Sequence, residues 1–193
     1  MPHLILASAS PRRKELLEQI GATFTQLAVD IDETVHFGEC ASDYVERLSC
    51  EKAQAGFDRA LMSDALVLGA DTSVVIDGRI LGKPTSEGDA VEMLMQLSGK
   101  RHQVMTSIAL IGHHVKVSQV VTTDVQFNIL NESQCREYWA TGEPADKAGA
   151  YGIQGLGAVF VQSLSGSYTG VVGLPLAETA VLLQKHDITI WHR

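Results

Sequence analysis

Two arginines stand where a helix normally favours negative charge. Arg12 and Arg13 follow Ser10 and Pro11, a pair typical of the N-cap and the first position of a helix. The first turn of a helix has free backbone N–H groups and the positive end of the dipole, so each cation there costs a few tenths to about 1 kcal/mol unless an anion binds. This turn therefore favours a phosphate-binding site made of backbone donors and guanidinium groups. The alternative is an ordinary capped helix whose arginines point into water.

Two lysines farther along the chain could add positive charge to such a site. Lys52 lies eight residues after Tyr44 and four after Leu48, on the predicted apolar side of a helix. An ammonium group there either extends to the surface or reaches a buried anion. Lys83 lies between a glycine and a proline in a predicted turn, and it is either a ligand-binding amine or a solvated side chain.

Carboxylates follow two of the predicted strands. Asp71 comes directly after the apolar run at residues 65–70, which is the placement expected of a catalytic or metal-binding carboxylate. The alternative for Asp71 is a local Asx turn. Glu33 closes the acidic run at residues 30–33, which follows a predicted strand at residues 24–29. Because acids at the end of a strand often line a cleft, both carboxylates are candidate site residues.

A glycine-rich stretch near the C-terminal end is a candidate for ligand recognition. Residues 148–157, AGAYGIQGLG, hold four glycines in ten residues, which predicts close approach of the backbone to another group. The stretch matches neither the dinucleotide-binding fingerprint nor the Walker loop. Gln154 is the side chain in this stretch that is suited to reading the edge of a base.

Strand-like and helix-like segments are mixed along the chain, which predicts an α/β fold with a mixed sheet. No repeat or linker divides the chain, so residues 1–193 are predicted to form one domain with two lobes around a cleft. The predicted strands cover residues 4–6, 24–29, 65–70, 73–76, 79–81, 102–111, 115–127 and 159–161. The predicted helices begin at the caps Ser10, Ser42, Ser86 and Asn131, and a last helix begins after Pro175.

Composition excludes several classes of protein. The chain has 193 residues, of which 45% are hydrophobic, so it can bury a full core. A formal net charge of −8 argues against a general nucleic-acid binder. The chain has neither a signal-peptide pattern nor an apolar run of membrane-spanning length, which predicts a cytoplasmic protein without membrane contact. Three cysteines without ligand spacing predict reduced thiols rather than disulfides or a zinc site; they are Cys40, Cys50 and Cys135.

Five ordered blocks of the sequence resemble those of the Maf family of nucleotide pyrophosphatases. The blocks are SASPRRKELL, LGADTSVVIDGRILGKP, SGKRHQVMTS, DKAGAYGIQG and VVGLPL, and they span nearly the whole chain. The resemblance implies a fold similar to that of inosine triphosphatase, an elongated mixed β-sheet flanked by helices with a central cleft. It also implies a homodimer that hydrolyses a nucleoside triphosphate to the monophosphate and diphosphate, with a divalent metal, Mg or Mn.

The resemblance assigns roles to residues by position. Asp71 matches the proton acceptor, and Glu33 matches the acidic position near the metal. Either carboxylate, or both, would ligate that metal. The residues that would bind the substrate's phosphates are Ser8, Arg13, Lys52 and Lys83.

Three further positions separate the subgroups of the family. Arg12, Thr72 and Gln154 resemble the subgroup that hydrolyses dTTP and UTP, rather than the one that hydrolyses 7-methyl-GTP. Modified pyrimidine triphosphates would be further candidate substrates, which would make the chain an enzyme that removes noncanonical nucleotides. Two alternatives stay open: a 7-methyl-GTP pyrophosphatase, and a regulator of cell division that binds nucleotides without hydrolysing them.

Overall fold

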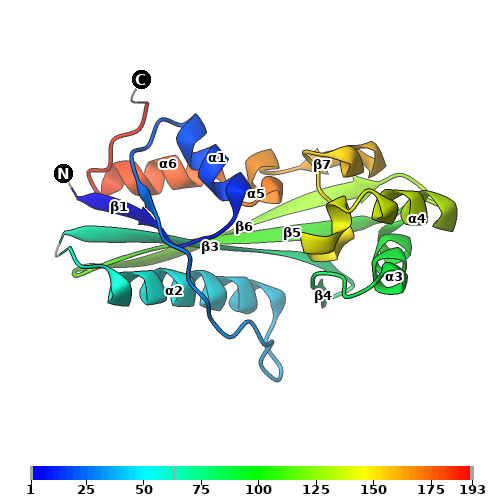
Figure 1. Cartoon of the computed structure of the whole chain (residues 1–193), viewed down its shortest axis with the longest axis horizontal. Coiled ribbons are helices and arrows are strands. Elements are labelled where there is room, and N and C mark those ends of the chain that lie inside the picture. The colour runs from blue at the N-terminus through cyan, green and yellow to red at the C-terminus, as the bar shows by residue number, and fades with distance from the viewer. Residues whose placement is uncertain (1, 63, 192–193) are drawn as a thin grey trace. The chain divides into compact units, whose positions relative to one another are not determined.

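A mixed β-sheet forms the framework of the computed structural model, which describes residues 2–62 and 64–191 (Figure 1). Its strands are β1 (His3–Leu6), β2 (Thr25–Gln26), β3 (Ala65–Ile76), β4 (Arg79–Leu81), β5 (Arg101–Gly112), β6 (Val115–Phe127) and β7 (Val161–Ser165). The order across the sheet is β2-β1-β3-β5-β6-β7, and β4 pairs with β3. Strand β1 is parallel to β2 and β3, whereas β4 is antiparallel to β3 and β7 to β6. The predicted α/β fold with a mixed sheet is confirmed.

Helices complete the described part of the chain. The α-helices are α1 (Pro11–Gln19), α2 (Ala41–Arg59), α3 (Glu87–Leu97), α4 (Glu132–Ala140), α5 (Tyr168–Val172) and α6 (Leu176–Lys185). Three short 3₁₀ helices are η1 (Glu143–Asp146), η2 (Ala148–Ala150) and η3 (Leu156–Phe160). None of the helices within residues 2–62 and 64–191 is both long enough and apolar enough to cross a membrane.

The chain divides into two compact units. Unit 1 consists of Met1–Asp71, Thr106–Val121 and Gly173–Arg193, and unit 2 consists of Thr72–Met105 and Thr122–Val172. Strands β3, β5 and β6 contribute residues to both units. Whether residues 1–193 act as one domain around a cleft stays a prediction.

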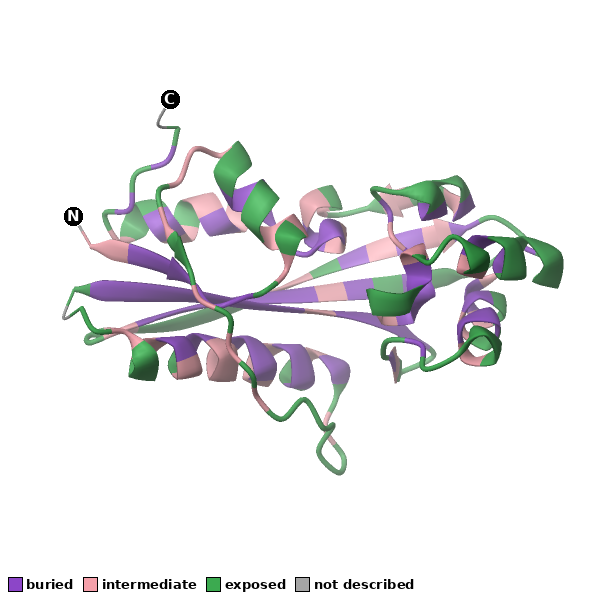
Figure 2. Ribbon diagram, in the orientation of Figure 1, coloured by how far each residue is buried: buried purple, intermediate pink, exposed green. Residues whose placement is uncertain are grey.

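The core of unit 1 lies between α2 and the sheet. In Figure 1, α2 covers one face of strands β1 and β3, and α1 and α6 lie on the other face. Along α2 the side toward the sheet is buried and the opposite side is exposed (Figure 2). Burying each large aliphatic side chain here contributes about 1.5–3 kcal/mol. The apolar cluster on this face includes Ile5, Ala7, Ala53, Ala65, Val67, Ala109 and Ile111.

Gly69 lets α2 and β3 approach closely. A Cβ atom at this position would overlap the carbonyl oxygen of Ser49 and would lie 2.6 Å from the backbone nitrogen of Ala53. Both of these groups belong to the backbone of α2, which cannot move aside as a flexible side chain could. The contact therefore requires glycine and fixes how α2 lies against the strand.

Local signals in the sequence predict the starts of α1, α3, α4 and α6 correctly. The Ser10 side chain accepts a hydrogen bond from the backbone N–H of Arg13, with Pro11 as the first residue of α1. Ser86 caps α3 in the same way. Asn131 and Gln134 form the predicted capping box of α4. Pro175 precedes α6, as predicted. The cysteines at 40, 50 and 135 are free in the structure.

Four local predictions are wrong. Helix α2 begins after Cys40 rather than at Ser42, whose hydroxyl lies 3.1 Å from the Cys40 sulfur. Strand β3 continues through Asp71 without a break, and it pairs with β1 at residues 65–68 and with β4 at residues 74–76. Val159 belongs to η3, and β7 begins at Val161. The predicted strand at residues 24–29 is reduced to β2.

A neutral histidine is buried in unit 2. His102 is 2% exposed, its Nε2 lies 2.8 Å from the Tyr151 hydroxyl, and its ring packs edge-on against Phe127. Its Nδ1 has no hydrogen-bond partner among the described residues. Burial disfavours the charged ring and lowers the pKa of His102 to about 4.

We expect His102 to make folding less favourable in mild acid. In the unfolded chain its pKa is near 6.5, so between about pH 6.5 and 4 the unfolded state binds a proton that the folded state does not. The contribution of His102 to the free energy of unfolding is therefore complete above about pH 6.5. It decreases as the pH falls, by about 2 kcal/mol between pH 7.5 and 5. Urea unfolding at both pH values should show this difference reduced in His102→Gln and retained in His114→Gln, whose imidazole is exposed. Equal pH dependence in His102→Gln and the wild type would contradict the assignment.

Candidate active site

The ammonium group of Lys52 lies between two carboxylates in unit 1. Its Nζ is 2.7 Å from Asp71 Oδ1 and 2.7 Å from Glu33 Oε1. The side chain of Lys52 is 12% exposed and that of Asp71 is 9% exposed, whereas that of Glu33 is 49% exposed. Lys52 therefore reaches a buried anion rather than extending into water, and Asp71 pairs with it from within β3 rather than in a turn.

The packing of α2 on β3 explains why these charges meet. Gly69 and Asp71 are two residues apart on a strand, so they face the same side of the sheet. Ala53 packs on Gly69, and Lys52 is its neighbour on α2. Close contact at Gly69 thus brings the two backbones together where the charged side chains pair. Removing one partner of such a buried pair typically costs 3–5 kcal/mol, because the other charge stays behind without compensation.

Arg13 is held against the loop that joins β1 to α1. Its Nε donates to the carbonyl oxygen of Gly173 at 2.9 Å, and its Nη1 donates to Ser8 Oγ at 3.4 Å. Ser8 is 6% exposed, and its hydroxyl also accepts from the backbone N–H of Ser10. Desolvation lowers the pKa of Arg13 from its ordinary value, the Asp71 charge opposes this shift and the neighbouring Arg12 adds to it. The guanidinium of Arg13 is thus anchored within unit 1 and near Asp71.

Helix α2 also holds the exposed loop that carries Glu33. The hydroxyl of Tyr44 donates to the backbone carbonyl of Glu33 at 2.9 Å. Arg47 binds both carboxylate oxygens of Glu39, with Nε–Oε1 at 2.6 Å and Nη2–Oε2 at 2.8 Å, and its Nη2 also donates to the Thr34 carbonyl. Hydrogen bonding to Arg47 lowers the pKa of Glu39 to about 2 and raises that of Arg47. Sequence reasoning missed Arg47 and Glu39, because only the folded loop shows that these two residues pair.

Of the remaining predicted site residues, Arg12 is half-buried in the first turn of α1 in unit 1, and the other three belong to unit 2. Thr72 is half-buried on β3, Lys83 is exposed after β4, and Gln154 is exposed in a turn between η2 and η3. The N–H of Gly149 donates to the carbonyl oxygen of Gly82 at 3.0 Å, which links the turn of Lys83 to the glycine-rich stretch. The structure thus brings together Ser8, Arg13, Glu33, Lys52 and Asp71 within unit 1. That Thr72, Lys83 and Gln154 join the same site stays a prediction.

The carboxylates of Glu33 and Asp71 supply oxygen donors, the type of ligand that magnesium prefers. One oxygen of each lies 2.7 Å from the same nitrogen of Lys52, so the two anionic oxygens converge on the position that this ammonium group occupies. No group of three or more His, Cys, Asp or Glu side chains in the described ranges could hold a metal. Magnesium is usually bound by one or two carboxylates together with substrate phosphates, and two converging carboxylate oxygens match this pattern.

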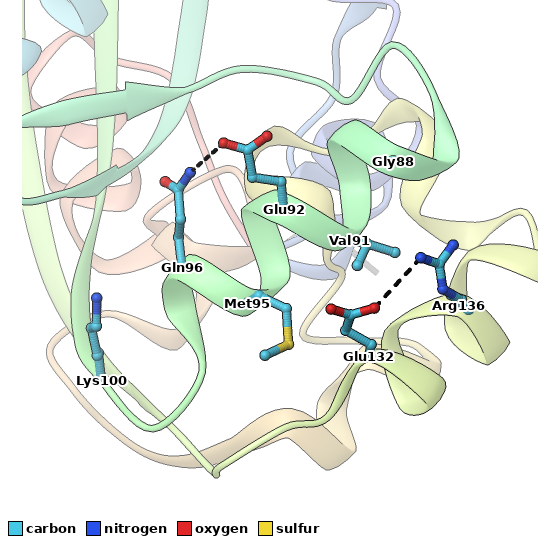
Figure 3. A pocket seen from close by; sticks show the side chains of 8 residues that line it. All are labelled: Gly88, Val91, Glu92, Met95, Gln96, Lys100, Glu132 and Arg136. Atoms are coloured by element: carbon cyan, nitrogen blue, oxygen red, sulfur yellow. Dashed lines mark hydrogen bonds and ion pairs between the residues drawn. The ribbon is translucent and has the colours of Figure 1, made fainter.

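A pocket elsewhere in unit 2 lies between α3 and α4 (Figure 3). It has a volume of about 570 Å³, and none of the predicted site residues lines it. Among the residues that line it, Arg136 pairs with Glu132, and Gln96 donates to Glu92. The pocket therefore gives no support to the predicted chemistry.

The cluster in unit 1 can bind an anion and accept a proton at neighbouring atoms. Arg13 is a hydrogen-bond donor anchored by Gly173 and Ser8, and Lys52 is a second donor. Guanidinium and ammonium groups both bind phosphate oxygens. Asp71 offers a carboxylate next to this positive charge. Such a combination is what hydrolysis at a phosphorus atom requires, since negative charge must be neutralised while water loses a proton.

We expect Arg47→Ala to loosen the loop that carries Glu33. The change removes a bidentate ion pair and a bond to the loop backbone, so amide hydrogen exchange in residues 32–40 should become roughly tenfold faster or more. Arg59→Ala is the matched control, because Arg59 lies on the same helix and its Nη1 donates to the backbone carbonyl of Ala28, outside residues 32–40. Exchange in these peptides that is unchanged by Arg47→Ala would show that Arg47 does not hold the loop.

Known proteins with related sequences cover nearly the whole chain. A Saccharophagus degradans protein named "dTTP/UTP pyrophosphatase" is 51% identical over 190 residues, 97% of this chain and 90% of that protein. A Vibrio parahaemolyticus protein of the same name is 54% identical over 182 residues, 94% of this chain and 96% of that protein. A third, from Colwellia psychrerythraea, is 54% identical over 183 residues, 93% of this chain and 86% of that protein. The model of the family described as "Maf-like protein" matches residues 3–186. The chain therefore belongs to the Maf family.

Proposed function

We propose that this chain is a pyrophosphatase that hydrolyses dTTP and UTP to the nucleoside monophosphate and diphosphate. The observation that carries the proposal is the cluster of Lys52, Asp71, Glu33 and Arg13 in unit 1. The substrates come from the relatives, which share 51–54% of their residues with this chain and are named for dTTP and UTP.

Asp71 is the proposed general base. Its carboxylate is mostly buried and pairs with Lys52, so its position is fixed before substrate arrives. A bound triphosphate competes with Asp71 and Glu33 for the ammonium group of Lys52. When Lys52 turns to the phosphates, Asp71 gains a free oxygen that can take the proton of a water attacking the α-phosphorus. The bond from that phosphorus to the bridging oxygen then breaks, and diphosphate leaves.

Arg13, Ser8 and Lys52 are the proposed phosphate ligands in unit 1, with Lys83 as a further one from unit 2. The anchoring of Arg13 by Gly173 and Ser8 holds its guanidinium in place, so little side-chain freedom is lost on binding. Charge stabilisation by such fixed donors is usually the largest single contribution to catalysis.

Glu33 and Asp71 are the proposed ligands of a divalent metal, Mg or Mn. Such an ion, when bound, would neutralise phosphate charge and make its water more acidic. Glu33 is the more exposed of the two carboxylates, and the Arg47 and Tyr44 contacts hold its loop in position to supply an oxygen.

Gln154 is the proposed reader of the pyrimidine edge, with Arg12 and Thr72 shaping the base pocket. A glutamine amide carries both a donor and an acceptor, which suits the adjacent carbonyl and N–H groups of uracil and thymine. A mismatched base would leave these polar groups without partners, which is how such sites discriminate strongly. The predictions of a homodimer and of action on modified pyrimidine nucleotides rest on the family resemblance.

Release of monophosphate and diphosphate from a panel of nucleotides tests the substrate assignment. We expect dTTP and UTP to be hydrolysed faster than 7-methyl-GTP in the presence of magnesium or manganese, and we expect a chelator to abolish turnover. Faster hydrolysis of 7-methyl-GTP would overturn the choice of substrate. Tight binding of UTP without release of diphosphate would instead support a regulator that does not hydrolyse nucleotides.

Asp71→Asn tests the catalytic assignment. Replacing a general base should lower kcat for dTTP by about 10² to 10⁴, with a smaller change in KM, because the amide keeps the shape of the side chain but cannot take the proton. Asp77→Asn is a matched control in the turn after the same strand, where asparagine tolerates the positive φ of 50°. A folded Asp71→Asn variant that hydrolyses dTTP at nearly the wild-type rate would rule out Asp71 as the base.

A further inference from the structure

A half-buried carboxylate lies under the glycine-rich stretch that carries Gln154. Glu143 begins η1, and its Oε1 accepts from the Tyr138 hydroxyl at 2.7 Å and from the N–H of Gly157 at 3.1 Å. Its Oε2 accepts from the N–H of Leu156 at 2.8 Å. Three donors thus converge on one carboxylate, and two of them belong to the backbone of the stretch.

Tyr138 extends this network to the other end of the same turn. Its hydroxyl donates to Glu143 and accepts from the N–H of Gly152 at 3.0 Å. Residues 152–157 are therefore held at both ends, at Gly152 through Tyr138 and at residues 156 and 157 through Glu143. Gln154 lies midway between these anchors with its side chain exposed.

The glycines of this turn are explained by the same carboxylate and hydroxyl. A Cβ atom at Gly155 would overlap the carboxylate of Glu143, and one at Gly157 would lie 2.6 Å from the Tyr138 hydroxyl. The backbone must pass this close for its N–H groups to reach Glu143. The bonds to Glu143 therefore require glycine at positions 155 and 157. A loop without a defined conformation would have no such requirement.

Glu143 accepts these bonds as an ionised group. Desolvation opposes its ionisation, but the hydrogen bonds from Tyr138, Leu156 and Gly157 outweigh this effect and lower the pKa of Glu143 below its ordinary value. Hydrogen bonds to a charged acceptor are roughly twice as strong as neutral ones. The turn is thus held by charge-assisted bonds at neutral pH.

We propose that Glu143, together with Tyr138, is a positioning residue that fixes the turn at residues 152–157 and so presents the amide of Gln154 to the nucleotide base. The inference rests on the proposed role of Gln154 and extends it to the residues that hold it. A side chain whose backbone is already fixed loses less freedom on binding, so its hydrogen bonds discriminate more between bases. Glu143 and Tyr138 thereby set base selectivity without touching the base.

The ratio of kcat/KM for UTP over CTP tests this proposal, because these nucleotides differ only at the edge of the base. In Glu143→Gln the side chain keeps its length, but its NH₂ group faces backbone N–H donors, so we expect the ratio to fall roughly tenfold or more. The loss should come mainly from KM for UTP. Glu132→Gln is the matched control, since it removes the same charge from an exposed residue of α4 and should leave the ratio unchanged.

Comparison with Gln154→Ala separates the inference from the proposed function. If Gln154→Ala keeps the wild-type ratio, Gln154 does not read the base and that part of the proposed function fails. If Gln154→Ala loses selectivity while folded Glu143→Gln retains it, the positioning role of Glu143 is overturned. In the double variant we expect the same ratio as in Gln154→Ala alone, because Glu143 acts through Gln154. If the losses of selectivity from the two single variants add in the double variant, Glu143 does not act through Gln154.

A second variant and a binding measurement test the proposal if Glu143→Gln does not fold or if the wild type does not hydrolyse nucleotides. Tyr138→Phe removes only the hydroxyl that joins Gly152 to Glu143, and it should lower the ratio in the same direction if Glu143→Gln does not fold. Dissociation constants for UTP and CTP should show the same loss of selectivity, so that binding tests the inference even if the wild type proves not to hydrolyse nucleotides. Wild-type ratios and dissociation constants in folded Tyr138→Phe and Glu143→Gln would overturn the proposal.

Discussion

The ion pairs of Lys52 with Asp71 and Glu33 are the interaction on which the candidate site depends. Charges that are mostly buried must be paired, so α2 and β3 can pack only in a register that brings Lys52 and Asp71 together. The absence of a side chain at Gly69 permits that register, because the backbone near Ala53 then lies directly against the strand. The same packing forms the apolar core of unit 1. Stability and site geometry thus come from one contact between a helix and a strand.

The fold was predictable where its signals are local. Ser10 and Asn131 cap their helices as predicted, because capping depends on a few neighbouring residues and the N–H groups that they satisfy. Errors occurred where tertiary contacts decide. Asp71 was expected to end a strand, but β3 is central in the sheet and continues. Helix α2 begins after Cys40 without a side-chain cap, and nothing in the sequence favoured this start over Ser42. Val159 lies in a 3₁₀ helix, although its residue type favours a strand.

The charged residues of the candidate site could be predicted from the sequence. The residues that hold the loops of the site in place could not. The position of Lys52 on an apolar stripe left a buried anion and the surface as alternatives, and the family resemblance pointed to the carboxylates. Arg47 and Glu143 carry no comparable signal, because a surface arginine or glutamate in a sequence is usually solvated. The spacing of glycines in residues 148–157 did indicate close approach to some group. Only the folded chain shows that this group is the Glu143 carboxylate with the Tyr138 hydroxyl.

Unit 1 is assembled from three stretches that are far apart in the sequence. Arg13 donates to the carbonyl of Gly173, and the N–H of Trp191 donates to the carbonyl of Ile20, so α1 is tied twice to the last stretch. A ribosome makes the chain from its N-terminus, so these ties form only when nearly all of it has been synthesised. Pairing residues so distant in sequence also slows folding. The arginine-bearing turn is among the first segments to be made and among the last to be completed. A truncated chain that stops before residue 173 lacks the Gly173 carbonyl that anchors Arg13 Nε.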